Sequence, residues 1–395
     1  MTVREPTADR AALLVETYGS PLYVYDAEQV RAAWRSFIEA FPYSPVDFHY
    51  AIVCNKNRHL VRLLHALGAG IHANTPGDAF AALQAGVPAH RIIYSGTNLD
   101  AADLDFLLSH RVRLNLDSVD QLRDFAARAP GGAVGLRLLV DDPSRPNRIG
   151  VDPEELPEAL EIARKAGVRL VGLHIYAGTN NRSLARFLAC FDRMMASSEL
   201  LPDLEELDAG GGFGVPYREG QEPLDLSALG REVARRMEEL SARRGRRIRL
   251  VIEPGRVLVA EAGSLLVKVI SVKERGGRRY VGVDTTVGNV VVESVYYPHH
   301  RVEAVAPKAP VLEIPTDVCG NTTHSRDYLA RNCQLPPLVP GDLLALRDVG
   351  AYGYAMSSHF LNRPRPAEVV VDQGQAVLTT RRETFADLLA TQVGT

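Results

Sequence analysis

Short apolar stretches alternate with amphipathic segments over the first two thirds of the chain. The apolar stretches are residues 46–53, 69–75, 91–96, 112–118, 134–140, 168–176, 204–212 and 248–254. Between several of them, apolar residues recur with helical spacing, as in residues 58–67 and 153–167. Near-continuous apolar strands separated by helices are typical of buried parallel sheets, and this number of repeats predicts a (β/α)8 barrel of the TIM type.

The pattern changes after Arg256, where the helical segments stop. The following strand-like runs are residues 262–274, 278–286, 289–297, 299–306, 309–318, 341–350 and 367–380. They predict an all-β, Greek-key-like second domain, completed by a strand from the N-terminal end of the chain. We therefore expect a barrel domain over residues 22–258 and a β domain over residues 259–395 together with 1–21.

Composition narrows the class of protein without identifying it. A chain of 395 residues exceeds the ~250–300 residues at which single cores stop growing, which agrees with two domains. A net charge of −3 gives no sign of a nucleic-acid or membrane partner, and no apolar run is long enough for a membrane span or signal peptide. The four cysteines have no close metal-type spacing, which favours a reduced, cytoplasmic protein.

Two motifs follow predicted strands and suggest a phosphate site. The first is the glycine run DAGGGFG (208–214), whose exposed backbone N–H groups suit a phosphate; alone it is a weak signal, because glycine is also common in tight turns. The second is EPGR (253–256), about forty residues later. The pair at this spacing is far more specific than either motif alone.

Together with HYAIVCN (49–55), GLHIYAGT (172–179) and GAYGYAMSS (350–358), these motifs resemble the diaminopimelate/ornithine decarboxylase family. Members are pyridoxal-phosphate (PLP) enzymes with an alanine-racemase-like barrel, and the order and spacing of the segments are kept over nearly the whole chain. The resemblance implies a homodimer with shared active sites and an amino-acid-type substrate. It also implies roles for cofactor-binding residues: phosphate contacts from Thr179, Gly211, Gly212 and Arg256, a ring-nitrogen contact from Glu253, and a phosphate or substrate contact from Tyr352.

The resemblance fails at the lysine that holds the cofactor. In the family the first segment carries the Schiff-base lysine, and here that position is Val53. Only five lysines occur in the chain, and Lys56 is the nearest, three residues further on. An odd offset along a strand points to the opposite face, so a solvated loop lysine is the favoured interpretation of Lys56, although it remains a candidate replacement.

Other expected reactive positions are also changed. His72 stands where the family has an acidic residue near the amine, and Tyr176 stands where a histidine stacks on the cofactor ring. The substrate-carboxylate arginine is absent from its segment, whose closest position is Val292. The Cys-Glu pair that reaches the neighbouring subunit keeps Cys319, but Gly320 replaces the acid. We therefore treat Val53, His72, Tyr176 and Cys319 as the candidate catalytic positions.

Two further possibilities were weighed from the residues. Cys54 follows Val53 but has no evident adjacent base, which favours a packing role. His72 and His174 suggest a metal, yet no third ligand follows at a diagnostic spacing, so hydrogen-bonded core histidines are favoured and no metal site is predicted.

These observations predict a diaminopimelate-decarboxylase-like protein that binds PLP non-covalently and acts on an amino-acid-type carboxylic acid, with a biosynthetic role. Two alternatives stay open. One is a catalytically silent homologue that acts as a binding or partner protein. The other is an engineered Lys-to-Val variant of an ordinary decarboxylase.

Overall fold

The protein folds into two compact units, which we call the barrel unit and the sheet unit. The structure is a computed structural model that describes residues 8–140, 147–291 and 300–394. The barrel unit consists of residues 33–215 and 222–257, and the sheet unit consists of residues 1–32, 216–221 and 258–395.

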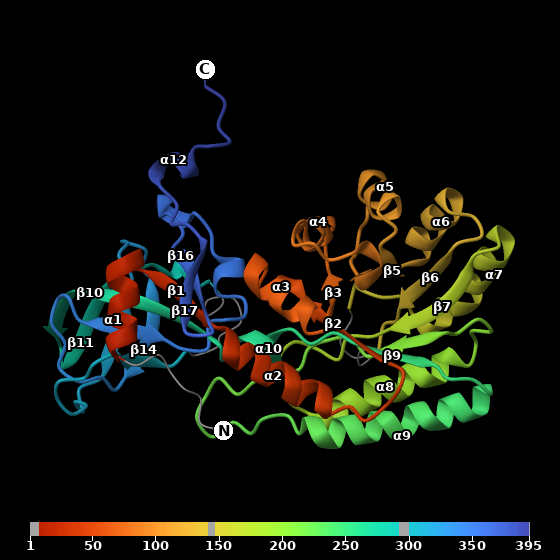
Figure 1. Ribbon diagram of the computed structural model, residues 1–395, viewed down its shortest axis with the longest axis horizontal. Helices are drawn as coiled ribbons and strands as arrows, with labels where there is room; N and C mark the ends of the chain where they lie inside the picture. The colour runs from red at the N-terminus through yellow and green to blue at the C-terminus, as the bar shows by residue number, and fades with distance from the viewer. Residues whose placement is uncertain (1–7, 141–146, 292–299, 395) are drawn as a thin grey trace. The chain divides into compact units, whose positions relative to one another are not determined.

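Eight parallel strands close into a barrel in the first of these units (Figure 1). They are β2 (Val46–Ala51), β3 (Gly70–Ala73), β4 (Ile92–Tyr94), β5 (Arg113–Leu116), β6 (Ala133–Arg137), β7 (Arg169–His174), β8 (Glu206–Asp208) and β9 (Arg249–Ile252). Closure comes from the pairing of β2 with β9, in which Val46 lies opposite Leu250. The predicted (β/α)8 barrel is confirmed, with a strand in every apolar stretch.

Helices cover the outside of the barrel strands (Figure 1). They are α2 (Ala27–Glu39), which begins in the sheet unit, α3 (Arg58–Ala66), α4 (Pro76–Gln84), α5 (Ala101–Ser109), α6 (Val119–Arg128), α7 (Leu156–Ala166), α8 (Leu184–Ser198) and α9 (Leu226–Arg244). Several begin at a residue whose side chain accepts a hydrogen bond from the first turn, such as Thr75 at α4 and Ser118 at α6. These caps fix where each strand-to-helix loop ends.

The sheet unit is built on a nine-stranded, mostly antiparallel sheet, which confirms the predicted all-β domain. Its strands are β1 (Leu22–Asp26), β10 (Gly263–Arg275), β11 (Arg278–Val283), β12 (Val302–Ala304), β13 (Thr316–Cys319), β14 (Tyr328–Cys333), β15 (Leu343–Leu346), β16 (Ala367–Asp372) and β17 (Gln375–Thr380). Among the described residues, α1 (Ala8–Tyr18) and α12 (Phe385–Leu388) lie in this unit, and α10 (Arg256–Val259) lies partly in it, as α2 does.

The N-terminal part of the chain does contribute a strand to this sheet. That strand is β1, which lies between β10 and β16, whereas the preceding described residues form helix α1. Helix α1 packs its apolar face on the sheet, where Leu14 joins a buried cluster with Leu22, Leu266 and Val369. We had expected this strand within residues 1–21. It begins just after them, at Leu22.

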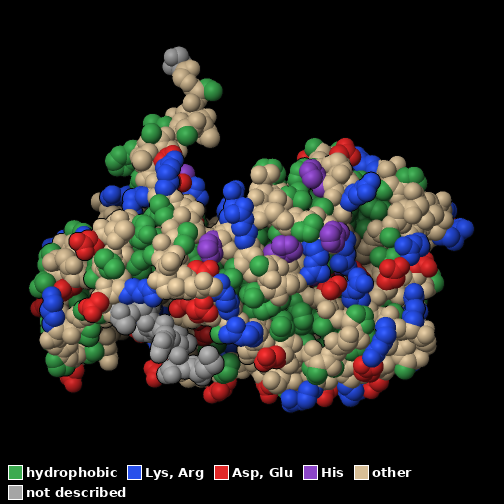
Figure 2. All heavy atoms as spheres, in the orientation of Figure 1, with side chains coloured by type: hydrophobic (Ala, Val, Ile, Leu, Met, Phe, Trp, Pro, Cys, Tyr) green, Lys and Arg blue, Asp and Glu red, His purple; other side chains and the backbone are tan. Residues whose placement is uncertain are grey.

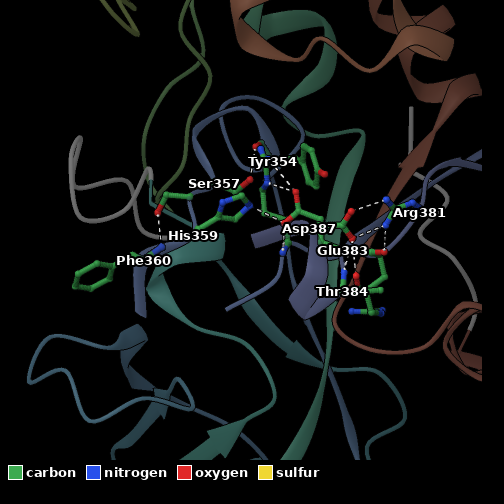
Figure 3. Close-up of polar contacts among 11 residues, drawn as sticks. Tyr354, Ser357, His359, Phe360, Arg381, Glu383, Thr384 and Asp387 are labelled. Carbon is green, nitrogen blue, oxygen red and sulfur yellow. Dashed lines mark hydrogen bonds and ion pairs between the residues drawn. The ribbon is translucent and has the colours of Figure 1, made fainter. Parts of the chain in front are cut away.

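The C-terminal segment is fastened to the sheet unit by polar contacts (Figure 3). Glu383 accepts hydrogen bonds from His359 Nε2 at 2.7 Å and from the backbone N and Nε of Arg365, both at 2.9 Å. Arg381 pairs with Asp387 of α12 through two contacts of 2.7 Å. Basic and acidic side chains are interspersed on the face shown in Figure 2, as the small net charge leads one to expect. Among the described helices, none is long and apolar enough to cross a membrane.

Candidate active site

Polar side chains gather at the carboxyl ends of the barrel strands. His72 lies on β3, His174 ends β7, Asp208 ends β8, and Glu253 directly follows β9. All four side chains are at least 95% buried. Because the barrel is closed, the carboxyl ends of strands that are far apart in the sequence lie close together, and the residues there become neighbours.

Glu253 is at the centre of this group. Its Oε1 lies 3.4 Å from Nε2 of His72, and its Oε2 lies 3.2 Å from Nε2 of His174. Asp208 lies on the other side, where it accepts hydrogen bonds from the backbone N of Gly210 at 2.9 Å and from Asn115 Nδ2 at 3.3 Å. The carboxylates of Asp208 and Glu253 are close enough to influence each other's ionisation.

Burial decides the ionisation of the group. It raises the pKa of Glu253 to about 8, against the opposing effects of the Asp208 hydrogen bond and the charge of Arg137. It lowers the pKa of His174 to about 4, and lowers the pKa of His72 well below the usual value, with further contributions from His174 and Arg137. At neutral pH both imidazoles are therefore neutral, and Glu253 holds a proton in most molecules.

The glycine run forms a cradle next to this group. Gly212 has a φ of +94°, and a Cβ there would lie 2.3 Å from the carbonyl oxygen of Gly178, so only glycine fits this close approach. In the described part of the chain, the backbone N–H groups of Gly211 and Gly212 donate to no protein acceptor. Two free, adjacent N–H donors in a tight loop suit a phosphate group.

The remaining predicted phosphate residues of the barrel unit lie at the same place. The hydroxyl oxygens of Thr179 and Tyr176 are 3.0 Å apart, and a Cβ on Gly212 would lie 3.3 Å from the Tyr176 ring. Arg256, which is 7% exposed, is near enough for its charge to act on the Tyr176 hydroxyl. The structure thus brings together Thr179, Gly212 and Arg256 around Tyr176.

These residues fit two parts of PLP, the phosphate and the ring nitrogen. The cradle supplies N–H donors and a guanidinium, and Glu253 Oε1 is a buried oxygen without a hydrogen-bond partner among the described residues. Burial keeps a proton on Glu253 that a basic ring nitrogen can take. The barrel unit can therefore contact both the phosphate and the ring nitrogen of PLP without a covalent bond.

Val53 lies in a short 3₁₀ turn directly after β2 (η1, Ile52–Cys54). The turn is held against the end of β9, since Ala51 N donates to the Pro254 carbonyl at 3.0 Å and Cys54 packs on Gly255. Val53 itself is 37% exposed, an unusual position for a valine. Lys56 is exposed, and its charge partly offsets the effect of burial, which raises the pKa of Asp78 on helix α4.

Tyr176 faces a cation across its ring, because the Arg137 guanidinium carbon lies 5.6 Å from the ring centroid. Arg137 ends β6, and its charge acts on His72, His174 and Glu253. The motifs gave no role to Arg137 or Asp208. The signal that could have found them is a polar residue within an apolar stretch, since Arg137, His174 and Asp208 are the last residues of β6, β7 and β8.

Cys319 and Tyr352 belong to the sheet unit. Cys319 ends β13 and is half-buried; burial, with Asp317 and Asp327 nearby, raises the pKa of its thiol to about 11. Tyr352 has a φ of +64°, a left-handed conformation that is strained for a tyrosine. The predicted arginine position, Val292, lies outside the described residues.

The contacts around position 320 in the sheet unit explain why this residue is a glycine. A Cβ at this position would lie 2.1 Å from Oδ1 of Asp327. Asp327 is buried and accepts hydrogen bonds from the backbone N of Val287 at 2.7 Å and of Thr322 at 3.0 Å. The Asp327 carboxylate therefore occupies the space in which an acidic side chain at position 320 would begin.

A separate cavity of about 340 Å³ lies among residues of the sheet unit. Its lining includes Asp284, Asn321, Arg363 and Arg382. No motif pointed to it. None of its lining residues is a predicted site residue.

Comparison with known proteins agrees with this geometry. Residues 27–260 match the family model for the pyridoxal binding domain of pyridoxal-dependent decarboxylases. The diaminopimelate decarboxylase of Methanothermobacter thermautotrophicus is 33% identical over 97% of this chain and 94% of its own length. That of Escherichia coli K12 is 30% identical over 98% of this chain and 97% of its own length.

A solved structure shows the same fold. The diaminopimelate decarboxylase of Helicobacter pylori, complexed with L-lysine, has a TM-score of 0.87 and 28% identity, covering 96% of this chain and 98% of that one. PLP is the cofactor of the matching family. On this evidence, the chain belongs to the pyridoxal-dependent decarboxylase family and is similar to its diaminopimelate decarboxylases.

Proposed function

We propose that this protein binds PLP without a covalent bond and acts on an amino-acid-type carboxylic acid, as a biosynthetic relative of the diaminopimelate decarboxylases. One observation carries the proposal. The phosphate cradle and Glu253 are complete, while Val53 stands at the position that the family resemblance gives to the lysine. A site that has kept phosphate and ring contacts but lost its amine is suited to hold the cofactor through non-covalent contacts alone.

The residues have distinct tasks in this proposal. Thr179, Gly211, Gly212 and Arg256 hold the phosphate, and Glu253 gives its proton to the ring nitrogen. The family resemblance gives Tyr352 a contact to the phosphate or to the substrate. When bound, PLP supplies an electron sink for bonds at the substrate's α-carbon. Arg137, at the end of β6, places a positive charge at the mouth of the barrel, which favours a substrate that carries a carboxylate.

Val53 limits the reactions that the site can carry out. In an ordinary member of the family, the lysine binds the cofactor covalently and displaces the product. Valine can do neither, so we expect slow turnover or a reaction other than simple decarboxylation. Cys319, with its thiol held protonated, is our candidate proton donor from the neighbouring subunit.

The test is the substitution Val53→Lys, with Val53→Leu as the control that changes shape without adding an amine. We expect Val53→Lys to create a visible chromophore with PLP that borohydride fixes to the protein, whereas the parent protein loses PLP on desalting. If Val53→Lys also creates amino-acid decarboxylase activity, the chain is an ordinary decarboxylase with one part missing. A fall in a native activity assigns the valine to a distinct mechanism.

Failure of this proposal has a clear signature. If the parent protein binds no PLP at millimolar concentration in calorimetry, and Val53→Lys changes neither absorbance nor activity, non-covalent cofactor binding is wrong. That result would favour the catalytically silent homologue.

The phosphate part of the proposal is tested with Arg256→Ala. A hydrogen bond to a charged donor contributes ~1.5–3 kcal/mol, so PLP should bind about 10- to 100-fold more weakly. Arg164→Ala, on the exposed face of helix α7, is the matched control and should leave PLP affinity unchanged. Equal affinities in the two variants would remove Arg256 from the site.

We also propose a homodimer with shared sites, because the resemblance gives Cys319 and Tyr352 a role only across a subunit interface. Light scattering at micromolar concentration should report the mass of two chains, since obligate interfaces generally bury more than ~2,000 Å². A monomer would remove Cys319 from the proposed site.

A further inference from the structure

Three side chains that commonly ligate metals converge inside the barrel. His72, His174 and Glu253 each direct one ligand atom into the same place, and these atoms lie within 4.8 Å of one another. They come from β3, β7 and the end of β9, and each is at least 95% buried. The histidine rings lie nearly parallel, with their centroids 6.2 Å apart and their planes inclined by 23°.

The protein leaves much of this group without hydrogen bonds. Among the described residues, neither ring nitrogen of His72 has a hydrogen-bond partner, and the same holds for Nδ1 of His174 and Oε1 of Glu253. A buried polar atom left unsatisfied costs ~1–3 kcal/mol, so four of them in one cluster need an explanation. The hydrogen-bonded core histidine favoured by the sequence is therefore wrong for His72.

The spacing of the ligand atoms is compatible with a bound metal ion. Zinc lies ~2.0–2.1 Å from its nitrogen and oxygen ligands, and a tetrahedral site therefore separates neighbouring ligands by roughly 3.3 Å. The two imidazole-to-carboxylate separations here are 3.4 Å and 3.2 Å. The 3.2 Å contact from His174 also lies within hydrogen-bond range, whereas the 3.4 Å contact from His72 is longer than an ordinary N–H···O bond of about 2.7–3.2 Å.

We propose that His72, His174 and Glu253 form a binding site for a divalent transition-metal ion of the Zn²⁺ type. Two imidazoles and one carboxylate are a common ligand set for such ions, and three protein ligands leave a fourth position open. The change that creates the set is at position 72, where the family resemblance places an acid. Asp208, held by Asn115 and the Gly210 backbone, lies beside Glu253 as a second buried acid next to the ligands.

This site goes beyond the proposed function and shares the residue Glu253 with it. Glu253 is a ligand of the metal ion in one case and the partner of the PLP ring nitrogen in the other. The two occupants therefore compete, and a protein loaded with the metal ion should bind PLP more weakly.

The experiment uses the full chain, freed of PLP and of metal ions, and titrates it with Zn²⁺ in a calorimeter. We expect one ion per chain. Co²⁺, used as a spectroscopic probe, should give the visible absorption of a tetrahedral complex. His72→Ala and Glu253→Gln should each weaken Zn²⁺ binding at least about 100-fold, since each removes a ligand.

His90→Ala is the matched control, because it removes an exposed histidine from the same unit and should leave Zn²⁺ affinity unchanged. Circular dichroism and thermal melting confirm that each variant is folded. His72→Phe, which keeps a ring at this position but removes both ring nitrogens, is a second test and should lose the Co²⁺ spectrum without loss of PLP binding.

Two results would overturn the site: no stoichiometric binding of Zn²⁺ to the parent protein, or equal affinity in the His72→Ala and His90→Ala variants. The proposed function fails separately. A parent protein that binds PLP but not Zn²⁺ removes only the metal site, whereas one that binds Zn²⁺ but not PLP removes only the PLP proposal.

Discussion

Two glutamates in this protein lie beside histidines and away from solvent, yet their environments are opposite. Glu383, in the sheet unit, accepts hydrogen bonds from His359 and from the backbone and side chain of Arg365 (Figure 3). Glu253, in the barrel unit, has one hydrogen-bonded oxygen and one oxygen without a partner among the described residues. Both carboxylate oxygens of Glu383 are hydrogen-bonded, which indicates a structural role. Glu253 keeps one oxygen that a ligand can contact.

The ionisation of the two carboxyl groups follows from this difference. Burial alone would raise the pKa of Glu383, but hydrogen bonds from Arg365 and His359 lower it overall. Burial raises the pKa of Glu253 to about 8, against the opposing effects of the Asp208 hydrogen bond and the charge of Arg137, and its two imidazole neighbours are neutral. A histidine neighbour does not by itself keep a buried carboxylate charged; a positive charge or several donors must do so.

The largest effect on stability should come from substitution of Glu383, the glutamate whose carboxylate oxygens are both hydrogen-bonded. Glu383→Ala removes the acceptor of three hydrogen bonds and leaves a histidine and an arginine without their partner. Because hydrogen bonds to charged groups contribute ~1.5–3 kcal/mol each and do not add fully, we expect a loss of about 3 kcal/mol. Urea unfolding measures it, and PLP affinity should not change. A loss below about 1 kcal/mol would contradict a structural role for Glu383.

The second effect is a change in pH dependence at Glu253. Its pKa is raised from 4.5 in the unfolded chain to about 8 in the folded protein, so the folded state keeps a proton that the unfolded state has lost. Stability therefore falls as pH rises from 4.5 through 8, by up to about 1.4 kcal/mol per pH unit. Glu253→Gln removes this dependence, so its stability relative to the parent should improve by about 2 kcal/mol between pH 6.5 and 8.

Glu383→Gln is the matched control for this titration. The pKa of Glu383 is lowered, so its stabilisation is present above the unfolded value and is lost only as pH falls through acid values. Between pH 6.5 and 8 the difference between Glu383→Gln and the parent should stay constant. Urea midpoints at several pH values decide the matter; a flat difference for Glu253→Gln would mean that Glu253 is ionised in the folded protein.

The sequence predicted the fold of the barrel well because its signal is local. Each barrel strand is buried on both sides, so each reads as an apolar run, and every run holds a strand. Strand β14 was missed for the opposite reason. Its residues Tyr328–Cys333 mix polar and apolar types at the end of the sheet path, where one side lacks a neighbouring strand, and a polar loop was the natural interpretation.

The candidate site was only partly predictable. Motifs identified Thr179, Gly212 and Arg256 one by one, and the structure brings them together around Tyr176. The metal-type cluster was not predictable by spacing, since 79 positions separate His174 from Glu253. Closure of the barrel makes them neighbours, and no local pattern records closure.

The smallest effect extends the comparison to two threonines. The Thr179 hydroxyl lies 3.0 Å from that of Tyr176 at the mouth of the barrel, and the Thr384 hydroxyl donates to Asp387 at 2.9 Å at the start of helix α12. Thr179→Val removes one hydroxyl donor to the charged phosphate, ~1.5 kcal/mol, so PLP should bind about tenfold more weakly with little change in stability. Thr384→Val removes a helix cap and should cost ~1 kcal/mol of stability without changing PLP affinity. Calorimetry gives the PLP affinity of each variant, and urea unfolding gives its free energy of unfolding. If Thr179→Val destabilises the protein and leaves PLP affinity intact, the role of Thr179 is structural.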